Sequence, residues 1–172
     1  MITNSAPAEY RIFRVFLWMV LIVYMLVLTK MILFKHSPGY IKRHFLYHYS
    51  WSDVKKHARE GNYTLFTTIK LYLNSRHTDY SIPNLAGNLV GFIPLGLLLP
   101  ALFRRLRSGW KIVLLTFLVS LAFETTQLLT ILGSFDVDDL LLNTIGGFIG
   151  YLVFLLFYYA GFRRTAVPIP TR

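Results

Sequence analysis

Four long apolar stretches, separated by short polar turns and one longer polar segment, dominate the chain. They cover residues 12–34, 84–103, 110–132 and 139–160. An α-helix rises about 1.5 Å per residue, so each stretch is long enough to cross a hydrocarbon layer about 30 Å thick. We therefore predict an all-α fold, a four-transmembrane-helix bundle with an outward segment between the first and second helices.

The first stretch, residues 12–34, could be confused with a signal peptide. The apolar part of such a peptide is only about 7–15 residues long and ends at a small-residue cleavage site. This stretch is longer, and no such site follows it. We predict that it is a retained anchor, preceded by a short cytoplasmic N-terminus over residues 1–11.

Basic residues gather on one set of flanks. The turn between the second and third spans carries four Lys or Arg and no acid, and the tail, residues 161–172, carries three Arg. The turn between the third and fourth spans carries acids and no base. The positive-inside rule then places both termini in the cytoplasm and residues 35–83 outside. The outer segment has eight basic and three acidic residues, so taken alone it would be placed in the cytoplasm. The other flanks all agree with the opposite placement, and we follow them.

The outer segment contains signals for short interfacial elements. Ser50 with Asp53 three residues later resembles a capping box, which predicts a surface helix over residues 51–60 that ends with Gly61 at the C′ position. Apolar residues at helical spacing predict that residues 64–74 lie along the lipid headgroups. An ordinary loop fits the same pattern.

Composition supports a membrane protein. Hydrophobic residues make up 55% of the chain and charged residues 15%, against about 25% charged in soluble domains. This excludes disorder and disfavours a freely soluble enzyme. With no Cys there is no disulfide, thiolate metal site or Cys nucleophile. The net charge of +10 follows from the loops that flank the spans, so we expect no nucleic-acid partner.

Glu124 is the clearest polar residue inside a span. It lies near the middle of the third span and shares a helix face with Ser120, Gln127 and Ile131. An ionisable group facing lipid is costly, so this face is expected to point into the bundle. Two roles remain open: a hydrogen-bonded packing residue or a functional carboxyl group.

The second span begins with two asparagines and contains residues that break a helix. Asn84 lies at its outer end, and Asn88 lies one turn further inside on the same face. Pro94 removes a backbone donor, and Gly91 and Gly96 allow another backbone, a water or a ligand to approach closely. Such breaks in membrane helices are retained where protein or a cavity satisfies the freed groups.

The fourth span begins with an acidic run. Asp136, Asp138 and Asp139 stand at its start, where carboxylates also satisfy unpaired amide groups, and Asn143 lies inside the span. Further along, small residues at G-x-x-x-G spacing predict close helix packing. They are Gly146, Gly147 and Gly150.

These polar positions lie on one side of the membrane, whichever way the protein is inserted. We predict that they converge in an acid-lined ligand-binding pocket that opens toward the outer leaflet. The predicted ligand-binding residues are Asn88, Glu124, Gln127, Asp136, Asp139 and Asn143.

Two kinds of chemistry suit such a pocket. Glu124, Asp136 and Asp139 are candidates for acid or base catalysis, and Asp136, Asp138 and Asp139 could hold a divalent cation through oxygen ligands. No cofactor is otherwise expected. The sequence has no Walker loop, nucleophile elbow or H-E-x-x-H motif. His44 and His48 have helical spacing, but no carboxylate completes a metal motif, so we favour interfacial roles for them.

Three ordered motifs now carry a resemblance. They are Asn-Leu-Val-Gly-Phe-Ile-Pro-Leu-Gly-Leu-Leu-Leu at 88–99, Phe-Glu-Thr-Thr-Gln at 123–127, and Phe-Asp-Val-Asp-Asp-Leu-Leu-Leu-Asn-Thr-Ile-Gly-Gly at 135–147. The series resembles the VanZ family of small bacterial membrane proteins. The positions that match family motifs are Asn88, Pro94, Gly96, Glu124, Gln127, Asp136, Asp139, Asn143 and Gly147.

The resemblance implies a multi-pass protein of the cell membrane and a tie to glycopeptide, especially teicoplanin-type, resistance. It supplies no biochemical activity. Many members place a basic residue before the acidic run, whereas Gly133 and Ser134 stand there in this chain. This departure from the family pattern leaves open whether the Asp residues have a built-in counter-ion.

Three functions remain open at this point. The first is a non-transporting envelope protein whose pocket binds membrane lipids, a lipid-linked cell-wall precursor or a lipoglycopeptide. The second is a small intramembrane enzyme acting on a lipid or cell-wall precursor, with Glu124 as acid or base. The third is a small permease, which four spans without an inverted repeat disfavour unless a homo-oligomer forms.

Overall fold

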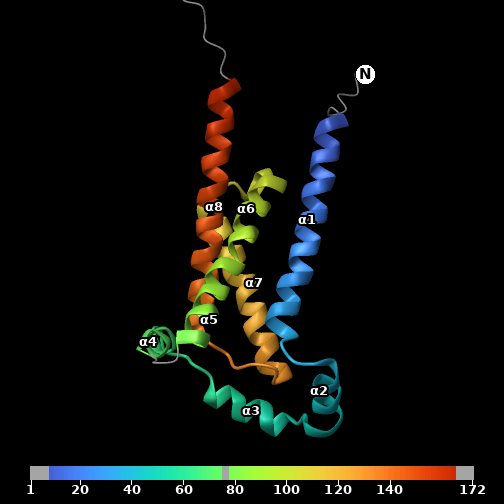
Figure 1. Ribbon diagram of the computed structural model, residues 1–172, viewed down its shortest axis with the longest axis vertical. Helices are drawn as coiled ribbons and strands as arrows, with labels where there is room; N and C mark the ends of the chain where they lie inside the picture. The colour runs from blue at the N-terminus through green and yellow to red at the C-terminus, as the bar shows by residue number, and fades with distance from the viewer. Residues whose placement is uncertain (1–7, 75–77, 166–172) are drawn as a thin grey trace, which may run out of the picture.

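The structure, a computed structural model, describes residues 8–74 and 78–165, and these residues are almost entirely helical (Figure 1). The helices are α1 (Ala8–Leu33), α2 (Pro38–Arg43), α3 (Trp51–Glu60), α4 (Thr67–Asn74), α5 (Thr78–Gly91), α6 (Ile93–Leu102), α7 (Gly109–Thr130) and α8 (Val137–Thr165). A π-helical turn covers His44–His48, and a 3₁₀ turn covers Arg104–Leu106. In the described ranges no strand forms.

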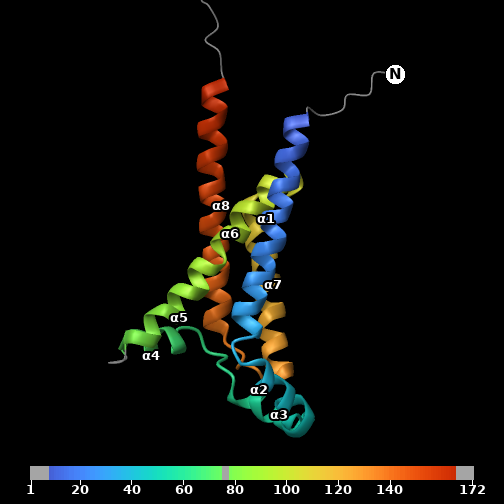
Figure 2. The same ribbon diagram turned by 45° about the vertical axis from the view of Figure 1, so that its right-hand side comes forward.

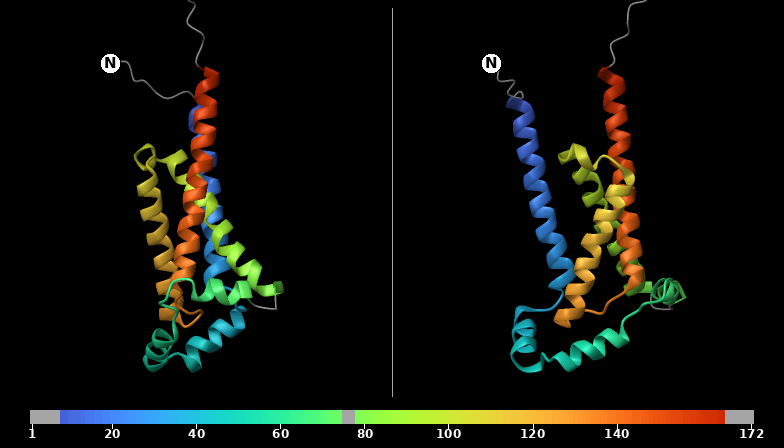
Figure 3. Two further views of the ribbon diagram at one scale, coloured as in Figure 1. Left: turned by 90° about the vertical axis from the view of Figure 1, so that its left-hand side faces the viewer. Right: turned by 180° about the vertical axis from the view of Figure 1, so that it is seen from behind.

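Four helical stretches are long and apolar enough to cross a membrane, which confirms the predicted all-α fold with four spans. They are Arg11–Leu33, Pro83–Leu102, Gly109–Thr130 and Val137–Gly161. The start of α1 and the end of α8 lie at the same end of the bundle, and α2, α3 and α4 lie at the opposite end (Figures 1 and 3). The segment between the first two spans therefore gathers at one end of the molecule.

The fourth span, α8, lies at the centre of the packing. It contacts α5, α6 and α7, whereas α1 packs mainly along α6 and α7. Large apolar side chains of α1 remain exposed, Leu26 and Met31 among them. Because the helix is apolar over 23 residues, these exposed side chains are suited to contact lipid.

Glycines bring α8 against the second span. A methyl group added at Gly96 would overlap the carbonyl of Gly147, and one added at Gly146 would overlap the carbonyl of Leu89. Gly150 meets the carbonyl of Ile93 in the same way. The helix backbones therefore touch at three successive places.

The second span is broken within residues 91–96, where its proline and glycines indicated a break. The helix is interrupted at Phe92, and α6 continues the oblique path of α5 (Figure 2). Pro94 falls in the first turn of α6, where proline is tolerated. The hydroxyl of Tyr24 in α1 donates to the carbonyl of Gly91 at 2.8 Å and so satisfies an acceptor at the break. Gly91 itself makes only ordinary contact with a Leu28 methyl group, so no close backbone approach occurs there.

Two helix ends differ from the predictions. The third span stops at Thr130, two residues before the predicted end, because Ile131 is left-handed with φ of 56° and is not part of the helix face. α3 covers residues 51–60 as expected, and the Ser50 hydroxyl accepts a bond from the Asp53 amide. Gly61 ends this helix in an extended conformation, so it does not form the left-handed C′ cap.

Candidate polar site at the α2–α4 end

Asp136 stands directly before α8 and caps it. Its carboxylate accepts the amide of Asp138 at 2.8 Å, which satisfies one of the free amides at the helix start. It also accepts the side chains of Asn62 at 2.8 Å and Thr68 at 2.6 Å. The same carboxylate therefore starts one helix and binds the outer segment.

Asp138 is fully buried and caps a different helix. Its two oxygens accept the backbone amides of Phe66, Thr68 and Ile69, the last two at 2.8 and 3.1 Å. These amides open α4, so a residue of the fourth span holds the start of an interfacial helix. The helical interpretation of residues 64–74 is correct, although the helix begins three residues later, after Phe66 in a left-handed conformation.

Asn62 is the second link between the outer segment and the bundle. The backbone N–H of Asn62 donates to the carbonyl of Phe135 at 2.8 Å, and the backbone carbonyl of Asn62 accepts the N–H of Val137 at 3.0 Å. This is a parallel bridge with Asp136 as its central partner. The sequence gives no periodic signal for Asn62, so the link could not be predicted.

Glu124 lies beneath this turn. It is only 3% exposed, and one of its oxygens accepts the backbone amide of Asp136 at 2.9 Å. Gln127, one turn later and also buried, donates to the carbonyl of Ile32 at 3.1 Å. The polar face of α7 therefore points into the bundle, where it holds the start of α8 and the end of α1.

A polar cavity of about 220 Å³ opens above these contacts. It is lined by Lys35, Thr68, Tyr72, Asn84, Asn88, Gln127, Leu132, Gly133, Ser134, Asp136 and Asp139. Asn88 of α5 and Asp139 of α8 both line it. Side chains of the second, third and fourth spans thus meet at one place.

Two of the six predicted ligand-binding residues do not line the cavity. Glu124 is not among the lining residues, and it contacts the backbone amide of Asp136, which is one of them. Asn143 lies one turn deeper than Asp139, between α7 and α8, where its amide donates to the Ser120 hydroxyl at 2.8 Å. The oxygen of the Asn143 side chain is buried with no hydrogen-bond partner in the structure.

Lys35 is the basic residue on this cavity. The turn directly before the acidic run, at Gly133 and Ser134, has none. Lys35 follows α1 and lines the same cavity as Asp136 and Asp139. The basic residue that shares the cavity with these Asp side chains thus comes from the end of the first span and not from the turn before the acidic run. Its only sequence signal was its place as the first charge after the first span.

The geometry does not favour the predicted cation site. Within the described residues, no three His, Asp or Glu side chains form a group that could hold a metal ion. The carboxylate of Asp138 is occupied by backbone amides, and Asp138 is not among the residues that line the cavity. The ring of His44 donates from Nε2 to the carbonyl of Thr130 at 3.0 Å, while the side chain of His48 lies outside the described part.

Comparison with known proteins agrees with this architecture. A family model described as VanZ/LLP1 matches residues 20–158. Protein VanZ of Enterococcus faecium is 40% identical over 63 residues, which are 37% of this chain and 38% of that protein. The match thus covers well under half of the relative's length. No solved structure matches the chain. Since the family model covers most of the chain, including every element that builds the polar cavity, the chain belongs to the VanZ/LLP1 family.

Proposed function

We propose that this chain lies in the cell membrane and lowers susceptibility to glycopeptides, in particular to teicoplanin-type lipoglycopeptides. Membership of the VanZ/LLP1 family and the similarity to Protein VanZ support this role. The distribution of basic residues supports cytoplasmic termini, which would place α2, α3, α4 and the polar cavity at the outer face.

The mixed charge of the cavity is the observation that carries the proposal. Asp136 and Asp139 face Lys35, and Asn84 and Asn88 add neutral donors and acceptors. Such a lining suits a ligand that carries both amide and charged groups, as peptide-bearing cell-wall precursors and glycopeptides do. Because the cavity lies where the spans end, a lipid-linked partner could reach it while its chain stays in the membrane.

A susceptibility assay tests this function. The chain is expressed in a susceptible host, and growth inhibition by teicoplanin is compared with inhibition by vancomycin, which lacks the acyl chain. We expect protection against teicoplanin, and we expect Lys35→Gln and Asp139→Asn to abolish it at equal protein levels. Lys42→Gln is the matched control, since Lys42 is exposed in the same segment and lies outside the cavity. Full protection by both cavity variants would refute the role of the cavity.

One observation supports an intramembrane enzyme as the second candidate. In the described part of the chain, one oxygen of Glu124 accepts the Asp136 amide and the other receives no hydrogen bond. A carboxyl group held in this way is free to exchange a proton on its second oxygen. The absence of Glu124 from the lining of the cavity argues against direct contact with a ligand bound there.

Glu124→Gln separates the two candidates. Glutamine keeps an oxygen that can accept the Asp136 amide but cannot exchange a proton as a carboxyl group does. If protection disappears while the amount and thermal stability of the protein stay unchanged, the enzyme reading is favoured. If protection persists, a binding protein is favoured.

A further inference from the structure

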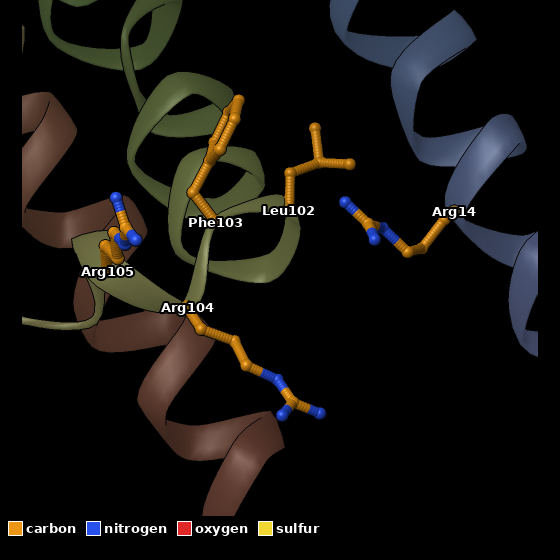
Figure 4. Close-up of a pocket in the computed structure, with 5 residues that line it drawn as sticks. All are labelled: Arg14, Leu102, Phe103, Arg104 and Arg105. Carbon is orange, nitrogen blue, oxygen red and sulfur yellow. The ribbon is translucent and has the colours of Figure 1, made fainter. Parts of the chain in front are cut away.

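A second hollow lies at the other end of the bundle, between α1 and the end of α6. Its volume is about 490 Å³, and its lining comprises Arg14, Leu102, Phe103, Arg104 and Arg105. In Figure 4, Arg14 reaches from α1 toward Leu102, and Arg104 extends from the 3₁₀ turn toward the same gap. Two guanidinium groups from different spans therefore border one opening.

No carboxylate neutralises these arginines in the described part of the chain. The one ion pair found there joins Lys56 to Glu60 in α3, at the opposite end. Glu9 is the only acidic residue in the sequence of the flanks that reach this end. The hollow therefore carries an uncompensated positive charge.

Two neighbouring basic side chains stabilise the fold through specific contacts. In the described part of the chain, the side chains of Arg14, Arg104 and Arg105 form no such hydrogen bond or ion pair. Arg107 donates to the carbonyl of Pro100 at 3.2 Å and stacks over the ring of Tyr158 at 4.8 Å. Lys111 donates to the carbonyl of Arg105 at 2.9 Å. The C-terminal end of α6 favours nearby cations, but the dipole of α1 gives Arg14 no such stabilisation. Packing and helix ends therefore do not account for Arg14.

Apolar side chains of the first and second spans lie beside the hollow. Trp18 lies one turn along α1 from Arg14, and its ring meets the ring of Phe103 edge-on with centroids 5.3 Å apart. Leu102 forms the buried floor. Positive groups at the membrane boundary are thus joined to aromatic and aliphatic groups below it, an arrangement that matches a phospholipid.

We propose that this hollow binds the phosphate headgroup of an anionic membrane lipid, with Arg14 and Arg104 on the phosphate oxygens and the lipid chain along Trp18 and Phe103. Guanidinium groups donate two parallel hydrogen bonds to phosphate, and basic hollows between transmembrane helices favour anionic headgroups. The adjacent apolar side chains select a lipid over free phosphate. The site lies at the opposite end from the polar cavity and is independent of the proposed function.

Native mass spectrometry of the full chain in detergent tests the site. Dioleoyl phosphatidylglycerol is titrated against the wild type, Arg14→Gln and Arg104→Gln, and dioleoyl phosphatidylcholine is titrated in parallel. We expect preference for phosphatidylglycerol and about a fivefold loss of affinity for each substitution. Arg11→Gln is the matched control, because Arg11 lies one turn from Arg14 on α1 but borders a different hollow. It is expected to change affinity less than twofold.

Three results would overturn the proposal. An equal loss with Arg11→Gln would indicate general surface charge instead of a site. Equal retention of the two lipids would remove the role of the headgroup charge. Displacement of phosphatidylglycerol by an equal concentration of inorganic phosphate would indicate a free-anion site. The substituted arginines are exposed, and a wild-type titration in rising salt, which should weaken phosphatidylglycerol binding, checks the electrostatic contribution without any variant.

Discussion

Replacing Asp138 with alanine should release α4 from the bundle. The carboxylate accepts three backbone amides, those of Phe66, Thr68 and Ile69, and is itself fully buried. Loss of a helix N-cap costs about 0.5–2 kcal/mol, and a hydrogen bond to a charged group contributes about 1.5–3 kcal/mol. Phe66 is half exposed, so water can replace part of this interaction. We expect a net loss of about 3 kcal/mol in the local stability of α4.

Hydrogen exchange at the amides of Thr68 and Ile69 measures this loss directly. Since about 1.4 kcal/mol corresponds to a factor of ten, exchange should be about a hundredfold faster in Asp138→Ala. The exchange rate in Asp138→Asn should lie between those of the wild type and Asp138→Ala, because one amide oxygen cannot replace both carboxylate oxygens. Asp53→Ala is the control, since Asp53 lies in α3 and should leave these two amides unchanged. Unchanged exchange in Asp138→Ala would refute the assignment of this cap.

Three further substitutions test contacts that position the site. Gly96→Ala should lower the thermal midpoint strongly, since the new methyl group overlaps the Gly147 carbonyl and overpacking costs about 1–3 kcal/mol or more. Tyr24→Phe should cost about 1 kcal/mol in a thermal unfolding assay, because the hydroxyl that satisfies the Gly91 carbonyl is lost. Asn62→Ala should increase proteolysis of the segment between α3 and α4, because its side-chain bonds to the start of α8 are removed.

Each of these has a control or a contrary result. Gly87→Ala should be nearly neutral, since nothing lies within 4 Å of the added methyl group. Equal effects of the two glycine substitutions would contradict the backbone contact between α6 and α8. A Tyr24→Phe protein as stable as the wild type would show that the break in the second span needs no donor from α1. Unchanged proteolysis in Asn62→Ala would leave the parallel bridge as the sufficient link.

The spans were predictable because length and hydropathy alone determine them. Helix ends were less so, since they depend on single residues with no periodic signal. The left-handed conformation of Ile131 shortens the third span. Glycine or asparagine usually occupies such a position, so an isoleucine there gave no signal that the helix ends. The break at Phe92 was indicated by Pro94, but its position two residues earlier follows from proline's preference for the first turn of a helix.

The polar site was predictable from the spans and not from the outer segment. Asn88, Gln127 and Asp139 lie on faces whose polarity already required burial, and all three line the cavity. Lys35 and Asn62 come from irregular chain, where neither period 2 nor period 3.6 constrains a side chain. Their positions depend on how the outer segment folds back over the bundle, which local sequence does not determine.

The acidic run shows why the sequence overstated the charge available to a ligand. Asp136, Asp138 and Asp139 lie within four positions in the sequence, but Asp136 precedes α8 and the other two, as successive helix positions, differ by about 100°. Their carboxylates therefore separate at the start of α8. Asp136 caps α8, and Asp138 caps α4. Only Asp139 combines a place on the cavity with no backbone amide bound to its carboxylate in the described part of the chain. Lys35 lines the same cavity, so its lining carries both signs of charge instead of three clustered carboxylates.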